Sequence, residues 1–212
     1  MKLYTANLCP YAQRVHALLL RLQIPYEHIE IDLDARDTSF LALTPTGRVP
    51  LLCDGDLRLY ESTIILEYLA DRAGWVEALP GDAQSRARQR LGMLRWDEAI
   101  LPAFYAALQG AWNGPPNEQC LEAELAELES TLVQTEAATD SLLGYHCAPH
   151  WIRMRWLGQS MPLFGSVISL PILHNWLDDT LDLKPIKQTL PLRHDVVSRY
   201  QSMRTQATTA SD

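Results

Sequence analysis

The sequence predicts an α/β domain of thioredoxin-like plan, joined by a short linker to an all-helical domain. Two observations support this fold class. Strand and helix patterns alternate through the first 75 residues in the order βαβ and then αββα, and everything after Pro80 has helical periodicity. We therefore expect a mixed four-stranded sheet with three helices over residues 1–75, a linker over 76–83 and a helical domain over 84–212.

The elements of the first domain follow from local signals. Pro10 suits a first helical turn, where its missing N–H is not needed. Asp54-Gly55-Asp56 between two apolar runs is a hairpin signal. The expected elements are strands at 2–5, 26–31, 49–53 and 57–60, and helices at 10–22, 37–43 and 62–72.

The second domain carries apolar residues at helical spacing. Gly114-Pro115-Pro116 separates its first two helices. The expected helices are 83–110, 117–139, 149–159, 170–181 and 191–203. The tail Thr205–Asp212 is expected to fray.

Composition excludes several function classes. The net charge of −8 repels phosphate backbones, which argues against nucleic-acid binding. No run of 18 apolar residues predicts a membrane span, and the N-terminus lacks the features of a signal peptide, so we expect a cytoplasmic protein. The four cysteines show no paired spacing for zinc or a redox dithiol and are expected to be free thiols.

Cys9-Pro10-Tyr11-Ala12 lies where a strand ends and a helix begins. Backbone N–H groups and the positive end of the helix dipole favour a thiolate there. Ala12 stands where a dithiol oxidoreductase would have its second cysteine, so an external thiol would have to resolve a mixed disulfide. The alternative is a buried structural cysteine.

Two further turns offer ligand contacts. A cis Pro50 after Gly47-Arg48-Val49 would leave the backbone of Val49 free to pair with an extended peptide, although many turns have this sequence. Ser62 at a helix start can bind a carboxylate, and Glu61 can accept an ammonium group. The alternative for Glu61 and Ser62 is an ordinary helix cap beside a solvated side chain.

Three stretches together resemble the cytosolic glutathione transferase superfamily. They are Cys9-Pro-Tyr-Ala-Gln-Arg14, Thr44-Pro-Thr-Gly-Arg-Val-Pro50 and Leu59-Tyr-Glu-Ser-Thr-Ile-Ile-Leu-Glu-Tyr-Leu69. They occur in the family's order and spacing across the first domain, and the first stretch is most similar to the omega and lambda classes. The resemblance implies the glutathione transferase fold, with glutathione as cosubstrate and no metal.

The resemblance also implies roles for individual residues. Cys9 would meet the glutathione sulfur, walled by Tyr11. Val49 would pair with the cysteinyl unit, with Pro50 cis. Glu61 and Ser62 would hold the γ-glutamyl head. Either Arg36 or Arg48 would face the glycyl carboxylate.

The site cysteine directs the expected activity. A cysteine favours a protein–glutathione disulfide and therefore glutathione-dependent thiol transfer or reduction of a small hydrophobic or disulfide substrate. Two alternatives are a conjugating transferase of beta-like type and a non-enzymatic protein like the stringent-starvation proteins. The resemblance also implies a homodimer, in which helix 62–72 of one subunit lies near helix 83–110 of the other.

The helical domain is expected to supply the acceptor site. Trp96, Tyr105 and Trp112 are candidates, although aromatic residues at helical spacing are often core. His146, Cys147 and His150 contain metal-binding residue types, but one short stretch without further ligands argues against a metal. The family starts its buried helix with Ser or Thr followed three residues later by Asp, and we expect Cys147-Ala-Pro-His150 to occupy that place.

Overall fold

A computed structural model describes residues 1–108, 115–158 and 170–209 of the 212-residue chain. Its sheet has the strand order β2-β1-β3-β4. β1 pairs in parallel with β2, and the other pairs are antiparallel. The strands are β1 (Lys2–Thr5), β2 (Glu27–Glu30), β3 (Leu51–Asp54) and β4 (Leu57–Tyr60). The predicted mixed four-stranded sheet is confirmed.

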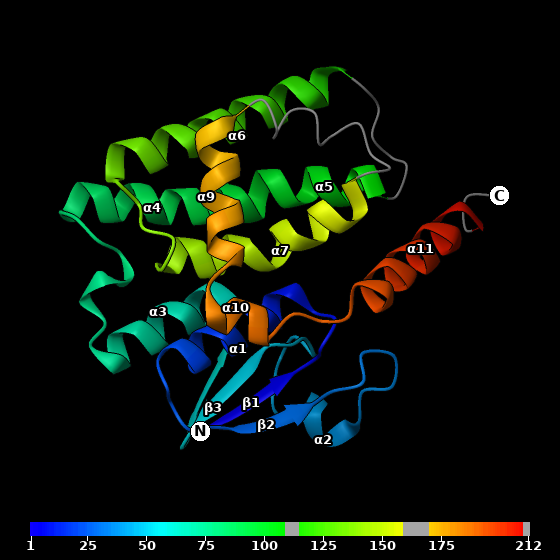
Figure 1. The fold of residues 1–212 in the computed structure, drawn as a ribbon. Coiled ribbons are helices and arrows are strands. Elements are labelled where there is room, and N and C mark those ends of the chain that lie inside the picture. The colour runs from blue at the N-terminus through cyan, green and yellow to red at the C-terminus, as the bar shows by residue number, and fades with distance from the viewer. Residues whose placement is uncertain (109–114, 159–169, 210–212) are drawn as a thin grey trace.

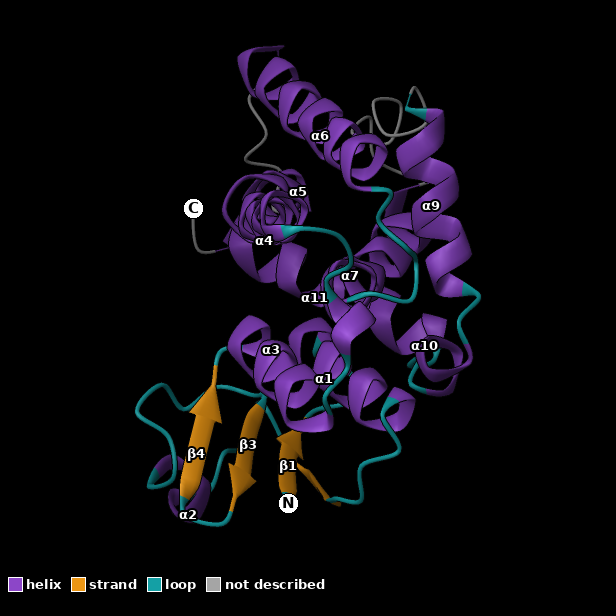
Figure 2. Ribbon diagram, turned by 90° about the vertical axis from the view of Figure 1, so that its left-hand side faces the viewer, coloured by secondary structure: helices purple, strands orange, loops and turns teal. Residues whose placement is uncertain are grey.

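Helices cover both faces of this sheet. They are α1 (Pro10–Arg21), α2 (Thr38–Leu41) and α3 (Ser62–Ala73). Leu3 and Leu52 are paired across β1 and β3 and belong to the same buried cluster as the apolar residues of α1 and α3. Leu51 belongs to a second cluster with Phe40 of α2. In Figure 2, α1 and α3 lie between the sheet and the remaining helices.

The rest of the chain is helical, as predicted. After a short 3₁₀ turn, η1 (Val76–Ala78), the elements are α4 (Ala83–Arg95), the π-helical turn η2 (Trp96–Ile100), α5 (Leu101–Leu108), α6 (Pro115–Thr135), α7 (Leu142–Gly158), α9 (Pro171–Leu181), α10 (Lys184–Gln188) and α11 (Arg193–Thr209). Figure 1 shows α7 crossing the middle of the helical layer, directly above α1 and α10. The described residues contain no helix long and apolar enough to cross a membrane.

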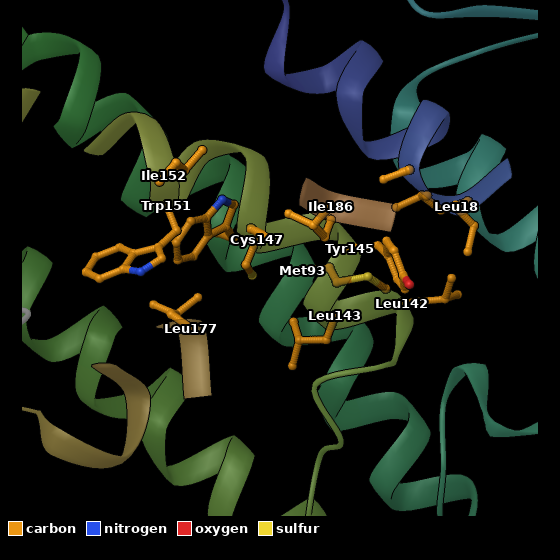
Figure 3. Close-up of a cluster of buried hydrophobic side chains, with 14 of the residues drawn as sticks. Leu18, Met93, Leu142, Leu143, Tyr145, Cys147, Trp151, Ile152, Leu177 and Ile186 are labelled. Carbon is orange, nitrogen blue, oxygen red and sulfur yellow. The ribbon is translucent and has the colours of Figure 1, made fainter. Parts of the chain in front are cut away.

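One apolar core joins the two layers. It includes Leu18 of α1, Met93 of α4, Trp151 of α7 and Ile186 of α10, which Figure 3 draws with their neighbours. Because α7 is buried on nearly every side, its sequence lacks the exposed polar face that usually reveals a helix, and its polar residues His146, His150 and Arg153 are themselves buried. The division into units at residues 75 and 84 stays a prediction, since the core is continuous across it.

Two predicted helices in the second half differ in the structure. The predicted helix 83–110 is interrupted by η2, a π-helical turn of the kind often found at functional sites. The predicted start at Pro149 is wrong, because α7 begins at Leu142. Pro149 lies inside this helix.

The start of α7 also corrects the predicted cap. The Ser141 hydroxyl accepts the N–H of Gly144 at 3.3 Å, so Ser141 caps the helix. A Cβ at Gly144 would lie 2.0 Å from the carbonyl oxygen of Thr139, which leaves no room for the aspartate expected at this place. Cys147 and His150 lie one and two turns further on and are fully buried, so they are not cap residues.

Candidate functional site

Cys9 stands at the N-cap of α1 with extended backbone geometry, as the sequence predicts. Its thiol points toward the carbonyl oxygen of Val49, with a sulfur–oxygen distance of 3.8 Å. Val49 precedes β3, and the Val49–Pro50 peptide bond is cis, as expected. These contacts bring together two of the three sequence stretches.

Burial controls the titration of Cys9. Burial raises the pKa of its thiol, while the N–H groups of Ala12 and Tyr11 at the helix start lower it. The positive charges of Arg153 and Arg14 lower the pKa further but do not cancel the effect of burial. The predicted preference for the thiolate at the helix start is present, but it is weaker than desolvation.

A cavity of about 280 Å³ is lined by Tyr11 and by Val49, whose carbonyl oxygen the Cys9 thiol approaches, but Cys9 itself does not line it. Arg48 supplies a cationic group to its wall, and Glu61 and Asp97 supply carboxylates. The lining residues are Tyr11, Thr46, Arg48, Val49, Pro50, Tyr60, Glu61, Ser62 and Asp97. Groups of both charges therefore surround a space that also offers backbone atoms at Val49.

Glu61 and Ser62 lie where β4 turns into α3. Glu61 has φ of 70°, a left-handed conformation that costs free energy for a residue with a side chain. Its side chain is exposed, whereas Ser62 is buried. The Ser62 hydroxyl oxygen accepts a hydrogen bond from Nη1 of Arg14 at 3.1 Å, which leaves the hydroxyl proton free to donate.

Arg14 is fully buried at the centre of this region. Its Nη2 donates to Oδ1 of Asp97 at 2.7 Å, and its Nε donates to the carbonyl oxygen of His146 at 2.7 Å. The guanidinium also lies 4.9 Å from the centre of the Tyr11 ring. Arg14 therefore connects the site to η2 and α7 and balances its charge with a carboxylate.

The charges around Asp97 fix its ionisation. Burial alone would raise the pKa of Asp97, but the His146 imidazole and the Arg14 guanidinium together hold this pKa well below its usual range. Nε2 of His146 lies 3.1 Å from Oδ1 of Asp97. Burial and the Arg14 charge lower the pKa of His146 to about 4, so this imidazole is neutral at pH 7.

A second buried arginine, Arg153 of α7, bonds to residues next to Cys9 in the chain. Nη2 of Arg153 donates to the carbonyl oxygen of Leu8 at 3.2 Å, and Nη1 donates to Oε1 of Gln13 at 2.6 Å. The rings of Tyr105 and Tyr200 stack with their centroids 6.3 Å apart. Both phenols act electrostatically on Arg153, and Cys9 acts on both phenols, so this group adjoins the thiol.

The structure separates the remaining predicted residues. Arg36 is exposed between β2 and α2 and does not line the cavity, whereas Arg48 does. Trp96 is fully buried in the apolar core, and it does not line the cavity. Tyr105 is half-buried near Cys9. Trp112 lies outside the described residues.

Several residues of this region had no predicted role. Arg14 ends the first of the three motif stretches, and its position one turn before Leu18 on an apolar helix face is a signal of burial. Asp97, Arg153 and Tyr200 gave no comparable signal, because they reach the site only through the packing of the helical layer. Within the described residues, no group of three or more metal-binding side chains gathers.

Comparisons with known proteins agree with this geometry. Residues 3–80 match the family model described as "Glutathione S-transferase, N-terminal domain". Glutathione S-transferase U6 of Arabidopsis thaliana is 26% identical over 203 residues, which cover 92% of this chain and 90% of the relative. The stringent starvation protein A homolog of Haemophilus influenzae is 37% identical over 109 residues, which cover 51% of this chain and 50% of the relative.

A solved structure supports the fold over nearly the whole chain. Glutathione transferase Omega 2C from Trametes versicolor superposes with a TM-score of 0.81 at 21% identity, over 96% of this chain and 98% of that protein. The match covers the helical layer as well as the sheet. Residues 3–80 thus match the N-terminal domain of the glutathione S-transferases, and the chain as a whole has the cytosolic glutathione transferase fold.

Proposed function

We propose that this protein is a glutathione-dependent thiol transferase that works through a mixed disulfide at Cys9. The observation that carries the proposal is a single thiol at the N-cap of α1, 3.8 Å from the carbonyl oxygen of Val49, a residue that lines the cavity. The structural likeness to an omega-class protein supports the same class. Ala12, one turn into α1, carries no second thiol.

The cavity wall fits the ends of glutathione. The free Ser62 proton can donate to the γ-glutamyl carboxylate, and the carboxylates of Glu61 and Asp97 can accept the ammonium group. Arg48 suits the glycyl carboxylate better than Arg36, because only Arg48 lines the cavity. The backbone of Val49, which precedes β3, remains for the cysteinyl unit.

The proposed reaction has two exchange steps. The Cys9 thiolate attacks the glutathione sulfur of a substrate–glutathione disulfide, forms the Cys9–glutathione disulfide and releases the substrate as a thiolate, which takes up a proton. A second glutathione thiolate then attacks the glutathione sulfur bound to Cys9. This step releases oxidised glutathione and restores the Cys9 thiolate.

One observation favours conjugation as an alternative. Burial raises the pKa of Cys9, and a neutral thiol can donate a hydrogen bond to a glutathione thiolate. A conjugating enzyme needs only that donor, and Cys9→Ser would retain it. Thiol transfer instead requires the sulfur itself, so the two activities separate in this variant.

The test compares the two activities in wild type and Cys9→Ser. We expect wild type to reduce a small glutathione disulfide and to gain one glutathione on exposure to oxidised glutathione, measured by intact mass. Cys9→Ser should lose both properties. A glutathione adduct that persists in Cys9→Ser, or equal disulfide reduction by both proteins, contradicts the proposal. Conjugation of an aryl halide by both proteins without disulfide reduction would establish the alternative.

The same assays address the non-enzymatic alternative. The similarity to a stringent starvation protein A homolog covers about half of each chain, so it does not decide between an enzyme and a binding protein. A protein that binds glutathione but neither reduces disulfides nor conjugates would support the binding role. A free thiol also requires a reducing compartment, and on this ground we propose a cytoplasmic location.

We also propose a homodimer that uses α3 and α4. Ile64 on α3 is 55% exposed, and Leu91 and Leu94 on α4 are 46% and 50% exposed. Exposed apolar side chains on neighbouring helices favour burial against a partner. Light scattering at micromolar concentration should give the mass of two chains for wild type, and Leu94→Glu should shift it toward one chain.

A further inference from the structure

We propose that Arg153 is a positioning residue that acts as the counter-ion of the Cys9 thiolate. This deepens the proposed function, on which its role in turnover rests. The inference starts from Arg153 itself, whose guanidinium group is fully buried and whose charge finds no anion among the described residues.

Within the described residues, every hydrogen bond of Arg153 goes to a neutral oxygen atom. Nη1 donates to Oε1 of Gln13 and to the carbonyl oxygen of Pro149, and Nη2 donates to the carbonyl oxygen of Leu8. Its Nε is buried and has no hydrogen-bond partner in the part of the chain that the structure describes. No carboxylate in the described part of the chain forms an ion pair with it, and the groups that act on its charge are Tyr200, Cys9 and Tyr105.

An anion stabilises a buried guanidinium group more than further neutral hydrogen-bond acceptors do. Arginine stays protonated in proteins, so it cannot relieve its desolvation by losing a proton. An isolated buried charge is costly unless it is paired. Burial raises the pKa of both Tyr105 and Tyr200, so these phenols remain neutral at pH 7 and supply no anion. Of the three groups, Cys9 ionises at the lowest pH in its ordinary state.

Arg153 forms hydrogen bonds with residues that precede and follow Cys9 in the sequence. Its two partners on the first domain are Leu8, directly before Cys9, and Gln13, whose N–H donates to the Cys9 carbonyl oxygen at 3.0 Å. The titratable and charged groups that act on Cys9 include Arg153 from α7 and Arg14 from α1. Cys9 also interacts electrostatically with the phenols of Tyr11, Tyr105 and Tyr200.

Arg14 cannot take this role in the same way. Asp97 already neutralises Arg14 through two hydrogen bonds of 2.7 and 3.2 Å. Arg153 is therefore the cation whose charge is available to the thiolate. When Cys9 is the leaving group of the second exchange step, its developing negative charge would meet this uncompensated cation.

The experiment measures the pH dependence of Cys9 alkylation by iodoacetamide, followed by intact mass without glutathione. In Arg153→Met, we expect the midpoint of the alkylation profile to rise by about one to three pH units. Arg153→Lys should recover most of that shift because it restores the charge. Cys9→Ser identifies the alkylated residue, and Arg155→Met is the matched control, because Arg155 is an exposed arginine of the same helix paired with Asp178.

A near-isosteric second variant protects the test from misfolding. Gln13→Glu places a carboxylate at the oxygen that lies 2.6 Å from Nη1 of Arg153. It should raise the melting temperature, because it pairs the buried cation, and should raise the Cys9 midpoint as well. The added charge alone would raise the midpoint but lower stability, so the gain in stability shows that the carboxylate pairs with Arg153, and the Arg153→Met profile shows that the cation acts on the thiol.

Distinct outcomes separate this proposal from the proposed function. An unchanged midpoint in folded Arg153→Met, or in Gln13→Glu, overturns the counter-ion role. A shifted midpoint in a protein that forms no glutathione adduct leaves the counter-ion role standing and contradicts thiol transfer. A shift of equal size in Arg155→Met would show that net charge alone is responsible and would also overturn the proposal.

Discussion

Arg14 and Arg153 are both fully buried where the first domain meets α7, yet their charges are treated in opposite ways. Arg14 is paired with Asp97 and also bonds to Ser62 and the carbonyl oxygen of His146. Arg153 bonds only to amide and carbonyl oxygens in the described part of the chain. The ion pair of Arg14 joins α1 to the helical layer. Arg153 instead keeps a positive charge without a carboxylate near the Cys9 thiol.

The groups around each arginine titrate in different pH ranges. Neutral histidines surround Arg14, and burial lowers the pKa of both His146 and His150. Arg153 adjoins two phenols and the Cys9 thiol, whose pKa values burial raises. Acid should therefore disturb the Arg14 region first, whereas alkaline titration should report on the Arg153 region.

The largest expected effect is the loss of the Arg14 ion pair. Arg14→Met leaves Asp97 without its cation, and removing one partner of a buried pair costs about 3–5 kcal/mol. Urea unfolding at pH 7.5 measures this loss. The control Arg21→Met removes a pair with Asp140 in which both side chains are over one-third exposed, and it should cost about 1 kcal/mol or less. Equal losses in the two variants would remove the distinction between them.

A smaller effect is expected from acid. His146 has a pKa of about 4 in the folded chain against about 6.5 when unfolded, so the unfolded chain binds more protons between these values. Stability should be constant above about pH 7 and should fall as the pH decreases from about 6.5 to about 4. Between pH 7.5 and 5.0, His146 alone should account for about 2 kcal/mol.

Urea unfolding of His146→Gln at these two pH values checks the assignment. The variant should lose less stability on acidification than wild type, whatever its stability at pH 7.5. His194→Gln is the control, because His194 is exposed near the start of α11. An unchanged acid loss in His146→Gln would place the proton uptake elsewhere.

The smallest expected effect is at the start of α7. Ser141→Ala removes the oxygen that accepts the Gly144 N–H and should lower the free energy of unfolding by about 1 kcal/mol. Since Ser141 is remote from Arg153 along the helix, the alkylation midpoint of Cys9 should not move. A changed alkylation midpoint would mean that the position of α7 as a whole, and not the charge of Arg153, determines the pKa of the Cys9 thiol.

The sequence by itself determined the parts of this protein that depend on short-range signals. The alternation of strands and helices, Cys9 at a helix start, the turn before Pro50 and the Glu61-Ser62 turn all follow from a few adjacent residues. Each of these features is present in the structure. Local backbone preferences and helix-end electrostatics act within a turn or two, so the sequence reveals them directly.

Tertiary structure decided what lies around those features. Arg14 meets Asp97 across 83 positions, and Arg153 meets Gln13 across 140. The start of α7 was misplaced because this helix is buried on nearly every side and its apolar residues show no clear period. The packing of whole helices determines that Arg14 pairs with a carboxylate and that Arg153 does not. Short stretches of sequence do not predict this difference.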